Sequence, residues 1–205
     1  MHSDGENIRR RFDRLAPWFD VLAAGMEGLF FRRLRKILWS QVQGTDIVEI
    51  GVGTGKNFEF YPQNVRITAI DFSPNMLALA KKKRDRTQLA VELTLMDAQS
   101  ICYADNSFDT VIACFVFCSV PRPRKALKEL HRILKPGGQL LLLEHVLSSN
   151  KVLASLMNRI NPAIVKLFGV NINRQTVKNV QACPFQKIYI DPVSTDMIKL
   201  IRAVK

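Results

Sequence analysis

Short apolar runs alternate along the chain with longer segments whose apolar residues recur at helical spacing, a pattern that predicts strands and helices in turn. The apolar runs are rich in Val, Ile and Leu, as is typical of buried strands, and their expected positions are 47–50, 65–70, 91–96, 108–114 and 139–146. Amphipathic helices are expected at 74–84 and 125–134, and Pro136-Gly137-Gly138 halts the second. The alternation predicts an α/β protein with a mainly parallel sheet.

The two ends of the chain extend this pattern. Residues 8–39 carry apolar side chains at helical spacing with arginines on the remaining faces, so amphipathic helices are expected there. Residues 152–168 predict an apolar helix interrupted by Pro162, and 186–190 with 197–202 predict a terminal antiparallel pair of strands. The expected fold is a doubly wound, mainly parallel seven-stranded sheet with N-terminal helices and this C-terminal strand pair.

Composition restricts the class of protein. A chain of 205 residues has the length of a single domain and can bury a core without disulfides or metal. The cysteines include no Cys-x-x-Cys pair and have no clustered histidines near them, which predicts reduced thiols, no metal site and a cytoplasmic protein. We find neither a signal peptide nor an apolar run of membrane-spanning length.

The net charge is +12, from 30 Lys and Arg against 18 Asp and Glu. This excess favours an anionic partner, which could be a phospholipid surface, a nucleic acid or an acidic small molecule; a solvated basic surface is the alternative. The basic N-terminal helices suit contact with an anionic membrane surface, although such helices also pack on their own domain.

Glycines at alternate positions follow the first predicted strand. Gly51, Gly53 and Gly55 let the backbone approach a ligand where any Cβ would collide, and a helix is expected to follow near Lys56. The next strand ends in Asp71, whose carboxylate can accept both hydroxyls of an adenosine ribose. Lys56 occupies the place of the third glycine of the dinucleotide fingerprint, which argues against NAD. The pattern predicts an enzyme with another nucleotide-like cofactor.

Further motifs follow in order, namely Asp97-Ala98, Ser107-Phe108-Asp109 and Leu134-Lys135-Pro136-Gly137-Gly138. With Glu49 and the glycine loop, they make the chain closely resemble the class I S-adenosylmethionine-dependent methyltransferases. The resemblance implies a Rossmann-like methyltransferase fold and S-adenosylmethionine as the cofactor.

The resemblance also implies which residues hold that cofactor. Asp71 would bind the ribose, Phe72 would flank the adenine, and Asp97 with Ala98 would meet the adenine edge. Met96 stands where the family usually has a glycine. The expected cofactor residues are Glu49, Gly51, Gly53, Gly55, Asn57, Asp71, Phe72, Asp97, Ala98 and Cys114.

Within the family, residues 12–20, 115–120 with 143–146, and 171–174 resemble a branch of lipid-associated enzymes. It holds phospholipid N-methyltransferases, small lipid-associated thiol methyltransferases and ubiquinone/menaquinone C-methyltransferases. Phe19-Asp20 stands where the branch usually has Tyr-Asp. In these relatives the N-terminal helices close over the cofactor and meet the membrane. The implied parts of the single domain are a helical lid (1–40), a cofactor-binding core (41–150), and an acceptor-side helix with the terminal strands (151–205).

Methyl transfer from a sulfonium is an in-line displacement, so the protein mainly aligns donor and acceptor and excludes water. An acceptor that carries a proton needs a base, and the candidate is His145 at the end of the fifth strand. The alternative for this histidine is that it satisfies buried backbone groups. The apolar helix 152–168 is expected to line the acceptor side.

The resemblance implies a membrane-derived amphiphile as acceptor, with the amine of phosphatidylethanolamine as the first hypothesis. A quinone ring carbon and a small thiol are close alternatives. Methylation of RNA is less favoured, because the strand ending at Cys114 is not followed by the Asn/Asp-Pro-Pro-aromatic turn that clamps an adenine amine. A cofactor-binding or membrane-scaffold protein without turnover would be indicated by loss of Gly53 or Asp71, and both are present.

Overall fold

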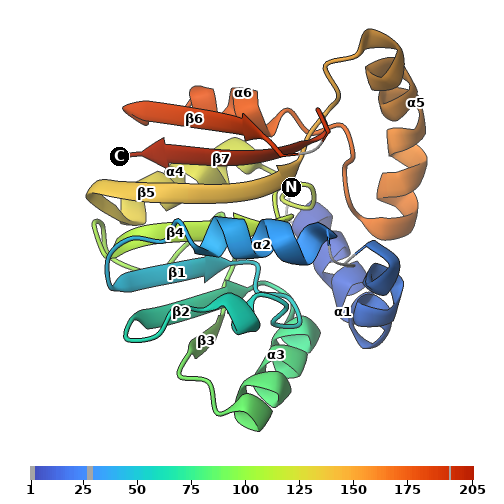
Figure 1. The fold of residues 1–205 in the computed structure, drawn as a ribbon. Coiled ribbons are helices and arrows are strands. Elements are labelled where there is room, and N and C mark those ends of the chain that lie inside the picture. Colours follow the sequence, from blue (N-terminus) through green and yellow to red (C-terminus); the bar gives the residue numbers. More distant parts are fainter. Residues whose placement is uncertain (1–2, 27–29, 194) are drawn as a thin grey trace.

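Apolar runs of the chain form one central β-sheet in the computed structural model, which describes residues 3–26, 30–193 and 195–205. The strands are β1 (Asp46–Ile50), β2 (Arg66–Asp71), β3 (Glu92–Leu95), β4 (Phe108–Cys114), β5 (Leu134–His145), β6 (Lys187–Pro192) and β7 (Ile198–Val204). Their order across the sheet is β3-β2-β1-β4-β5-β7-β6, and β7 runs antiparallel to both of its neighbours while the other pairs are parallel (Figure 1). The expected doubly wound, seven-stranded sheet with a C-terminal antiparallel pair is confirmed.

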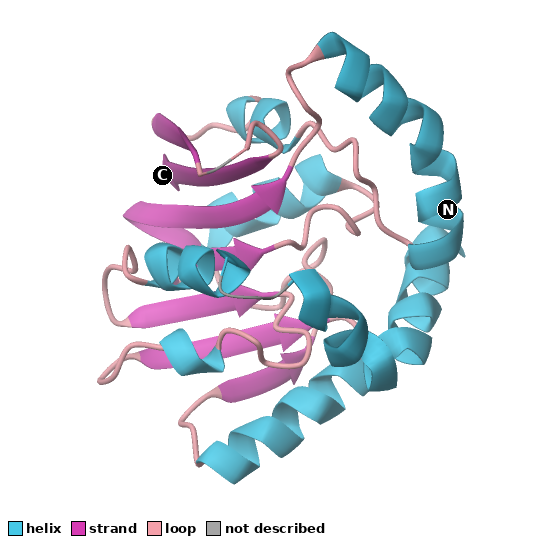
Figure 2. Ribbon diagram, turned by 45° about the vertical axis from the view of Figure 1, so that its right-hand side comes forward, coloured by secondary structure: helices cyan, strands magenta, loops and turns pink. Residues whose placement is uncertain are grey.

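Helices cover both faces of this sheet, and two more lie beyond the carboxyl ends of its parallel strands. They are α1 (Ser3–Met26), α2 (Arg32–Trp39), the 3-10 helix η2 (Phe58–Phe60), α3 (Pro74–Thr87), α4 (Pro123–Ile133), α5 (Lys151–Phe168) and α6 (Thr176–Gln181). α2 and α3 pack on one face, and α4 and α6 pack on the other. α1 and α5 lie beyond the ends toward which the parallel strands point (Figure 1 and Figure 2).

β5 shows why the sheet is buried on both faces. Successive side chains of a strand point to opposite sides, so Leu140 and Leu142 join the core under α4 while Leu141 and Leu143 join the core under α2. All four are fully buried. Continuous apolar runs, rather than alternating ones, are what such a two-sided strand requires.

One expectation about helices needs correction. Only the three-residue η2 forms near Lys56, so the expectation of a full helix there is wrong. Gly53 and Gly55 both have positive φ, which is incompatible with a right-handed α-helix, and the chain turns through residues 53–57 before η2 begins. α1 and α2 agree with the expected N-terminal helices, and residues 27–29, part of the expected helical segment 8–39, lie outside the described residues.

Within the described ranges, no helix is both long enough and apolar enough to cross a bilayer.

Candidate active site

The parallel strands all end on the same side of the sheet, near α1 and α5 (Figure 2). A cavity of about 1040 Å³ opens there, beside the point between β1 and β4 where the strand order reverses. Its walls come from the segments after β1, β2, β3, β4 and β5, from α1 and α2, and from residues 170–172 after α5. This volume is at the upper end of the range for ligand pockets, so two ligands can lie side by side.

Most of the residues expected to hold a cofactor meet at this cavity. Those that line it are Gly51, Gly53, Asn57, Asp71, Phe72, Asp97, Ala98 and Cys114, and the proposed base His145 joins them. Glu49 and Gly55 are not among the lining residues. The fold therefore brings side chains from several separate strand ends to one space.

The loop after β1 requires glycine for different reasons at its three positions. Gly51, Gly53 and Gly55 have φ of 69°, 55° and 80°, which a residue with a Cβ rarely adopts. A Cβ on Gly51 would also lie 2.5 Å from a methyl of Val116, and one on Gly55 would lie 2.6 Å from the Phe58 ring. A Cβ on Gly53 would meet no protein atom within 4 Å. At Gly53 the backbone is therefore bare toward the cavity.

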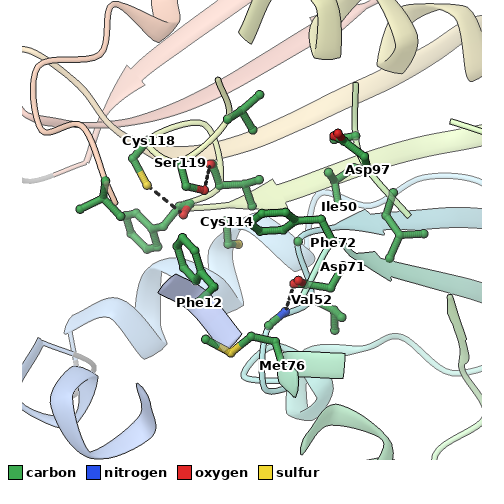
Figure 3. Close-up of a pocket in the computed structure, with 18 of the residues that line it drawn as sticks. Phe12, Ile50, Val52, Asp71, Phe72, Met76, Asp97, Cys114, Cys118 and Ser119 are labelled. Atoms are coloured by element: carbon green, nitrogen blue, oxygen red, sulfur yellow. Dashed lines mark hydrogen bonds between the residues drawn. The ribbon is translucent and has the colours of Figure 1, made fainter. Parts of the chain in front are cut away.

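Asp71 ties the glycine loop to the end of β2. Its Oδ2 accepts a hydrogen bond from the Gly53 N–H (2.8 Å), and its Oδ1 accepts one from the Ser73 N–H (2.8 Å) (Figure 3). Burial raises the pKa of Asp71 to about 6, against the lowering effect of these backbone hydrogen bonds. Each carboxylate oxygen keeps a second lone pair that can accept a ligand hydroxyl.

Glu49 stabilises the same loop from behind the cavity wall. Its carboxylate accepts hydrogen bonds from the Asn57 side-chain amide and from the Tyr61 hydroxyl. Arg35 Nη1 in turn donates to Asn57 Oδ1 at 2.9 Å. Burial raises the pKa of Glu49 to about 7, and the Tyr61 and Asn57 hydrogen bonds oppose it. Glu49 thus positions Asn57, which does line the cavity.

Aromatic rings and a carboxylate form another part of the wall. The rings of Phe12 on α1 and Phe72 after β2 meet edge to face, with centroids 5.7 Å apart, and both side chains reach toward the same space (Figure 3). Ala98 is buried, whereas Asp97 is exposed, and its carboxylate accepts the Gln99 N–H at 2.8 Å. This wall offers a flat apolar surface and a hydrogen-bond acceptor, which suits an adenine ring.

α1 is fastened to the two loops that carry the site. The Asp13 carboxylate accepts hydrogen bonds from Ser73 Oγ (2.6 Å) and from the Asn75 N–H (3.2 Å). Asp20 accepts one from Thr54 Oγ1 at 2.8 Å in the glycine loop. α1 therefore forms part of the cavity wall and is held there by hydrogen bonds to both loops.

The segment after β4 has a backbone conformation that is rare for its residue type. Phe115 has φ of 56°, which costs a residue with a Cβ about 1–3 kcal/mol. Its ring packs against Phe31 (centroids 5.1 Å apart) and under the Arg35 guanidinium (5.4 Å). Cys114 precedes it; burial raises the pKa of this thiol to about 12, so the sulfur is protonated at neutral pH.

His145 is the last residue of β5, and its ring lines the cavity. Burial lowers its pKa, and a hydrogen bond to the Ile172 backbone partly opposes the shift. The imidazole is therefore neutral at pH 7 and able to accept a proton. Its neighbour Glu144 is fully buried and accepts the Val116 and Phe117 N–H groups (2.8 and 3.1 Å), which fixes the segment after β4.

Arg35 and Phe31 are among the residues of the site that sequence reasoning missed. Arg35 and Phe31 line the cavity, but in the sequence Arg35 is one of many arginines assigned to the polar faces of the N-terminal helices. The usable signal was helical spacing, because Arg35 lies three residues before Leu38 and shares its buried face.

The expectation that the helix 152–168 lines the acceptor side is not met. All of α5 is described, and none of its residues lines the cavity; Val170, Asn171 and Ile172, just beyond its end, do. The apolar residues of α5 repeat instead on its exposed face.

The chain is 31% identical over 189 residues to thiol S-methyltransferase TMT1B of Rattus norvegicus, across 85% of this chain and 78% of that protein. The chain belongs to the S-adenosylmethionine-dependent methyltransferases. Its residues 48–142 also match the family described as "Methyltransferase domain". The methyltransferase is 35% identical over 126 residues to phosphatidylethanolamine N-methyltransferase of Cereibacter sphaeroides, across 60% of this chain and 62% of that one. It is 34% identical over 143 residues to demethylmenaquinone methyltransferase of Paenarthrobacter aurescens, across 68% and 55%.

A solved structure from Thermotoga maritima, described as an S-adenosylmethionine-dependent methyltransferase and possible histamine N-methyltransferase, shares the fold of this methyltransferase. The TM-score is 0.72 at 20% sequence identity, across 96% of this chain and 99% of that one. The methyltransferase therefore binds S-adenosylmethionine, which supplies an electrophilic methyl group on its sulfonium.

Proposed function

We propose that this methyltransferase methylates the amine of a phosphatidylethanolamine-type lipid. The observation that carries the proposal is the polarity of the cavity wall. Arg9, Arg122 and Lys125 line the cavity and are exposed, so they lie at its rim, whereas Val116 and Ile172 belong to its apolar lining. A phosphate with an attached amine fits such a wall, because the cations hold the phosphate while an apolar interior excludes water.

The residue roles proposed for the cofactor follow from the same wall. Asp71 accepts the ribose hydroxyls with its remaining lone pairs, the bare backbone at Gly53 admits the amino-acid end, and Phe72 covers the adenine. Asp97 and Ala98 form the adenine edge. These roles agree with the burial and hydrogen bonding described above.

His145 is proposed as the base. The neutral imidazole takes a proton from the substrate ammonium, and the lone pair of the freed amine nitrogen attacks the methyl carbon while the carbon–sulfur bond breaks. S-adenosylhomocysteine leaves with the electron pair of the broken bond. The remaining contribution of the protein is alignment of donor and acceptor.

The first experiment measures transfer of labelled methyl from S-adenosylmethionine into four acceptors: phosphatidylethanolamine vesicles, a small alkyl thiol, a demethylated quinone and RNA. The Asp71→Asn protein is the blank. We expect label in the phospholipid. Label confined to another acceptor would replace the lipid proposal with that substrate class.

The basic rim gives a sharper test. The double variant Arg122→Gln/Lys125→Gln is expected to raise KM for phosphatidylethanolamine about tenfold, because charge-assisted hydrogen bonds to the phosphate are lost. The matched control is Lys128→Gln/Arg86→Gln, which removes the same charge from exposed positions that do not line the cavity. Equal effects of both pairs would refute a phosphate subsite.

The second candidate is S-methylation of a small thiol. It is favoured by the thiol methyltransferase relative that aligns with 85% of this chain. A thiol carries no phosphate, so the Arg122→Gln/Lys125→Gln variant would keep its KM for the thiol, while loss of His145 would still slow transfer. A quinone ring carbon is the third candidate and is tested in the same acceptor panel.

We also propose that the N-terminal helices contact an anionic membrane surface. Arg10 and Arg14 are exposed on α1, and so are Trp18 and Val21. Cations that reach headgroups beside an interfacial tryptophan are typical of helices that lie on a bilayer.

A further inference from the structure

α5 carries an exposed apolar stripe that the folded chain does not cover. Val152, Leu156, Ile160 and Leu167 are 81%, 53%, 42% and 67% exposed. At 3.6 residues per turn these four positions fall within about 80° of the helix circumference, so they form one continuous strip. Of the eighteen residues of α5, all of which are described, Met157 alone is buried.

Helices of this length are marginally stable in water unless an apolar face is packed. Polar contacts help to hold α5 on the protein. Asn150 caps its first turn by accepting the Val152 and Leu153 N–H groups, and Asn161 Oδ1 accepts the Ile172 N–H at 2.9 Å. The strip thus faces away from the protein and is free to pack on something else.

The charge beside the strip indicates what packs there. α5 contains Lys151, Arg159 and Lys166 and no acidic residue, and all three cations are exposed. A second copy of this chain would bring like charges together, within molecules that each carry a net +12. An anionic lipid surface instead offers apolar chains to the strip and negative headgroups to the cations.

We propose that α5 is a membrane-insertion helix, whose strip enters the headgroup–acyl boundary of an anionic phospholipid bilayer. The segment that follows α5 connects this surface to the active site. Asn171 donates to the Cys118 carbonyl from its N–H (2.8 Å) and its side-chain amide (3.1 Å), and both residues line the cavity. α5 bound to a bilayer therefore holds the cavity wall next to the lipid. The inference does not depend on which acceptor is methylated.

The test is cosedimentation of the full chain, without cofactor, with vesicles of phosphatidylcholine alone or mixed with phosphatidylglycerol. We expect binding to the anionic vesicles only. The variant Leu156→Gln/Ile160→Gln/Leu167→Gln should bind at least about tenfold less, since three apolar side chains no longer enter the bilayer. Tyr189→Gln, at an exposed apolar position on β6, is the matched control and should bind like the wild type.

A second pair of variants separates α5 from general charge attraction. Lys151→Gln/Arg159→Gln/Lys166→Gln should weaken vesicle binding more than Lys81→Gln/Lys82→Gln/Arg86→Gln, which removes the same charge from α3. Equal losses, or an unchanged glutamine strip variant, would overturn the proposal. So would a wild-type dimer in lipid-free solution that the strip variant converts to a monomer, because the strip would then belong to a second copy. Methyl-transfer failure with normal vesicle binding would count against the proposed acceptor alone.

Discussion

Asp71 is a buried carboxylate that is already bonded to the backbone on both of its oxygens. If it also accepts ribose hydroxyls, cofactor binding favours its ionised form. Because its pKa is raised to about 6, we expect the affinity for S-adenosylmethionine to increase as pH rises from 5 to 7. Asp71→Asn should weaken binding by roughly 1–3 kcal/mol and remove this pH dependence.

Isothermal titration with S-adenosylmethionine at several pH values checks the prediction for Asp71. Asp85→Asn, at an exposed position on α3, is the control. If the asparagine protein binds as tightly as the wild type at pH 7, Asp71 has a role in holding the loop and none in holding the cofactor.

His145 makes a separate prediction about rate. His145→Gln should lower kcat about 10²- to 10⁴-fold, as expected for loss of a general base, and leave cofactor affinity nearly unchanged. Burial lowers the pKa of His145, so the wild-type rate should fall only when pH drops below the ordinary histidine value near 6.5. The variant should lack that acidic limb.

The pH profile of kcat checks the role of His145, with His131→Gln as the comparison. His131 lies on α4 with its ring against Phe185, and it is not among the cavity-lining residues. A fully active His145→Gln protein would assign the histidine to packing.

At the residue scale, the sequence predicted which side chains at strand ends would meet at the cavity. Gly51, Asp71 and His145 each follow or end an apolar strand, and parallel strands end together. The sequence did not reveal that Glu49 lies off the cavity. Glu49 points to the face of the sheet opposite Val48 and Ile50, where Asn57 and Tyr61 bond its carboxylate.

At the element scale, two carboxylates of α1 bond the loops that carry the site, and we expect them to hold α1 over the cavity. Asp13→Asn/Asp20→Asn should weaken the charged hydrogen bonds to Ser73 and Thr54, worth on the order of 1 kcal/mol each at this partial exposure. We expect faster hydrogen exchange in α1 and release of cofactor that is several-fold faster.

Hydrogen exchange with mass spectrometry, together with stopped-flow release of S-adenosylmethionine, checks this prediction for α1. The control Asp85→Asn/Asp191→Asn removes the same charge from exposed positions on α3 and β6. Unchanged exchange and release would mean that apolar contacts such as Phe12 with Phe72 hold α1 without the carboxylates.

Elements with strong apolar periodicity were predictable, whereas those decided by backbone conformation were not. Glycines that look like the start of a helix produced turns with positive φ and only the short η2. The apolar periodicity of α5 correctly predicted a helix, but it did not predict that the apolar face points to solvent. Periodicity shows that a face is apolar, and it does not show whether the protein itself covers that face.

For the whole molecule, three buried carboxyls control the dependence of stability on pH. Burial raises the pKa of Asp71, Glu49 and Glu144 to about 6, 7 and 8. In the unfolded chain these groups ionise near pH 4, so between about pH 4 and 8 the folded state binds more protons. The free energy of unfolding of the cofactor-free protein should therefore fall as pH rises through this range.

Thermal unfolding from pH 5 to 8, in moderate salt to screen the net positive charge, checks the direction. In the Glu144→Gln protein, the melting temperature should change less with pH at the alkaline end of this range. The carboxyls of Asp46 and Asp109, whose pKa values are lowered and which both bond Lys135, lose their contribution only at lower pH. A melting temperature that rises from pH 5 to 8 would contradict the prediction.

The placement of β7 between β5 and β6 also matters while the chain is being synthesised. β5 is complete at His145, but its outer edge has no partner until residues 198–204 emerge from the ribosome. During that interval a long leucine-rich strand presents unpaired backbone groups, which is a condition that promotes association between nascent chains. The exposure of this edge therefore lasts as long as residues 198–204 take to follow β5.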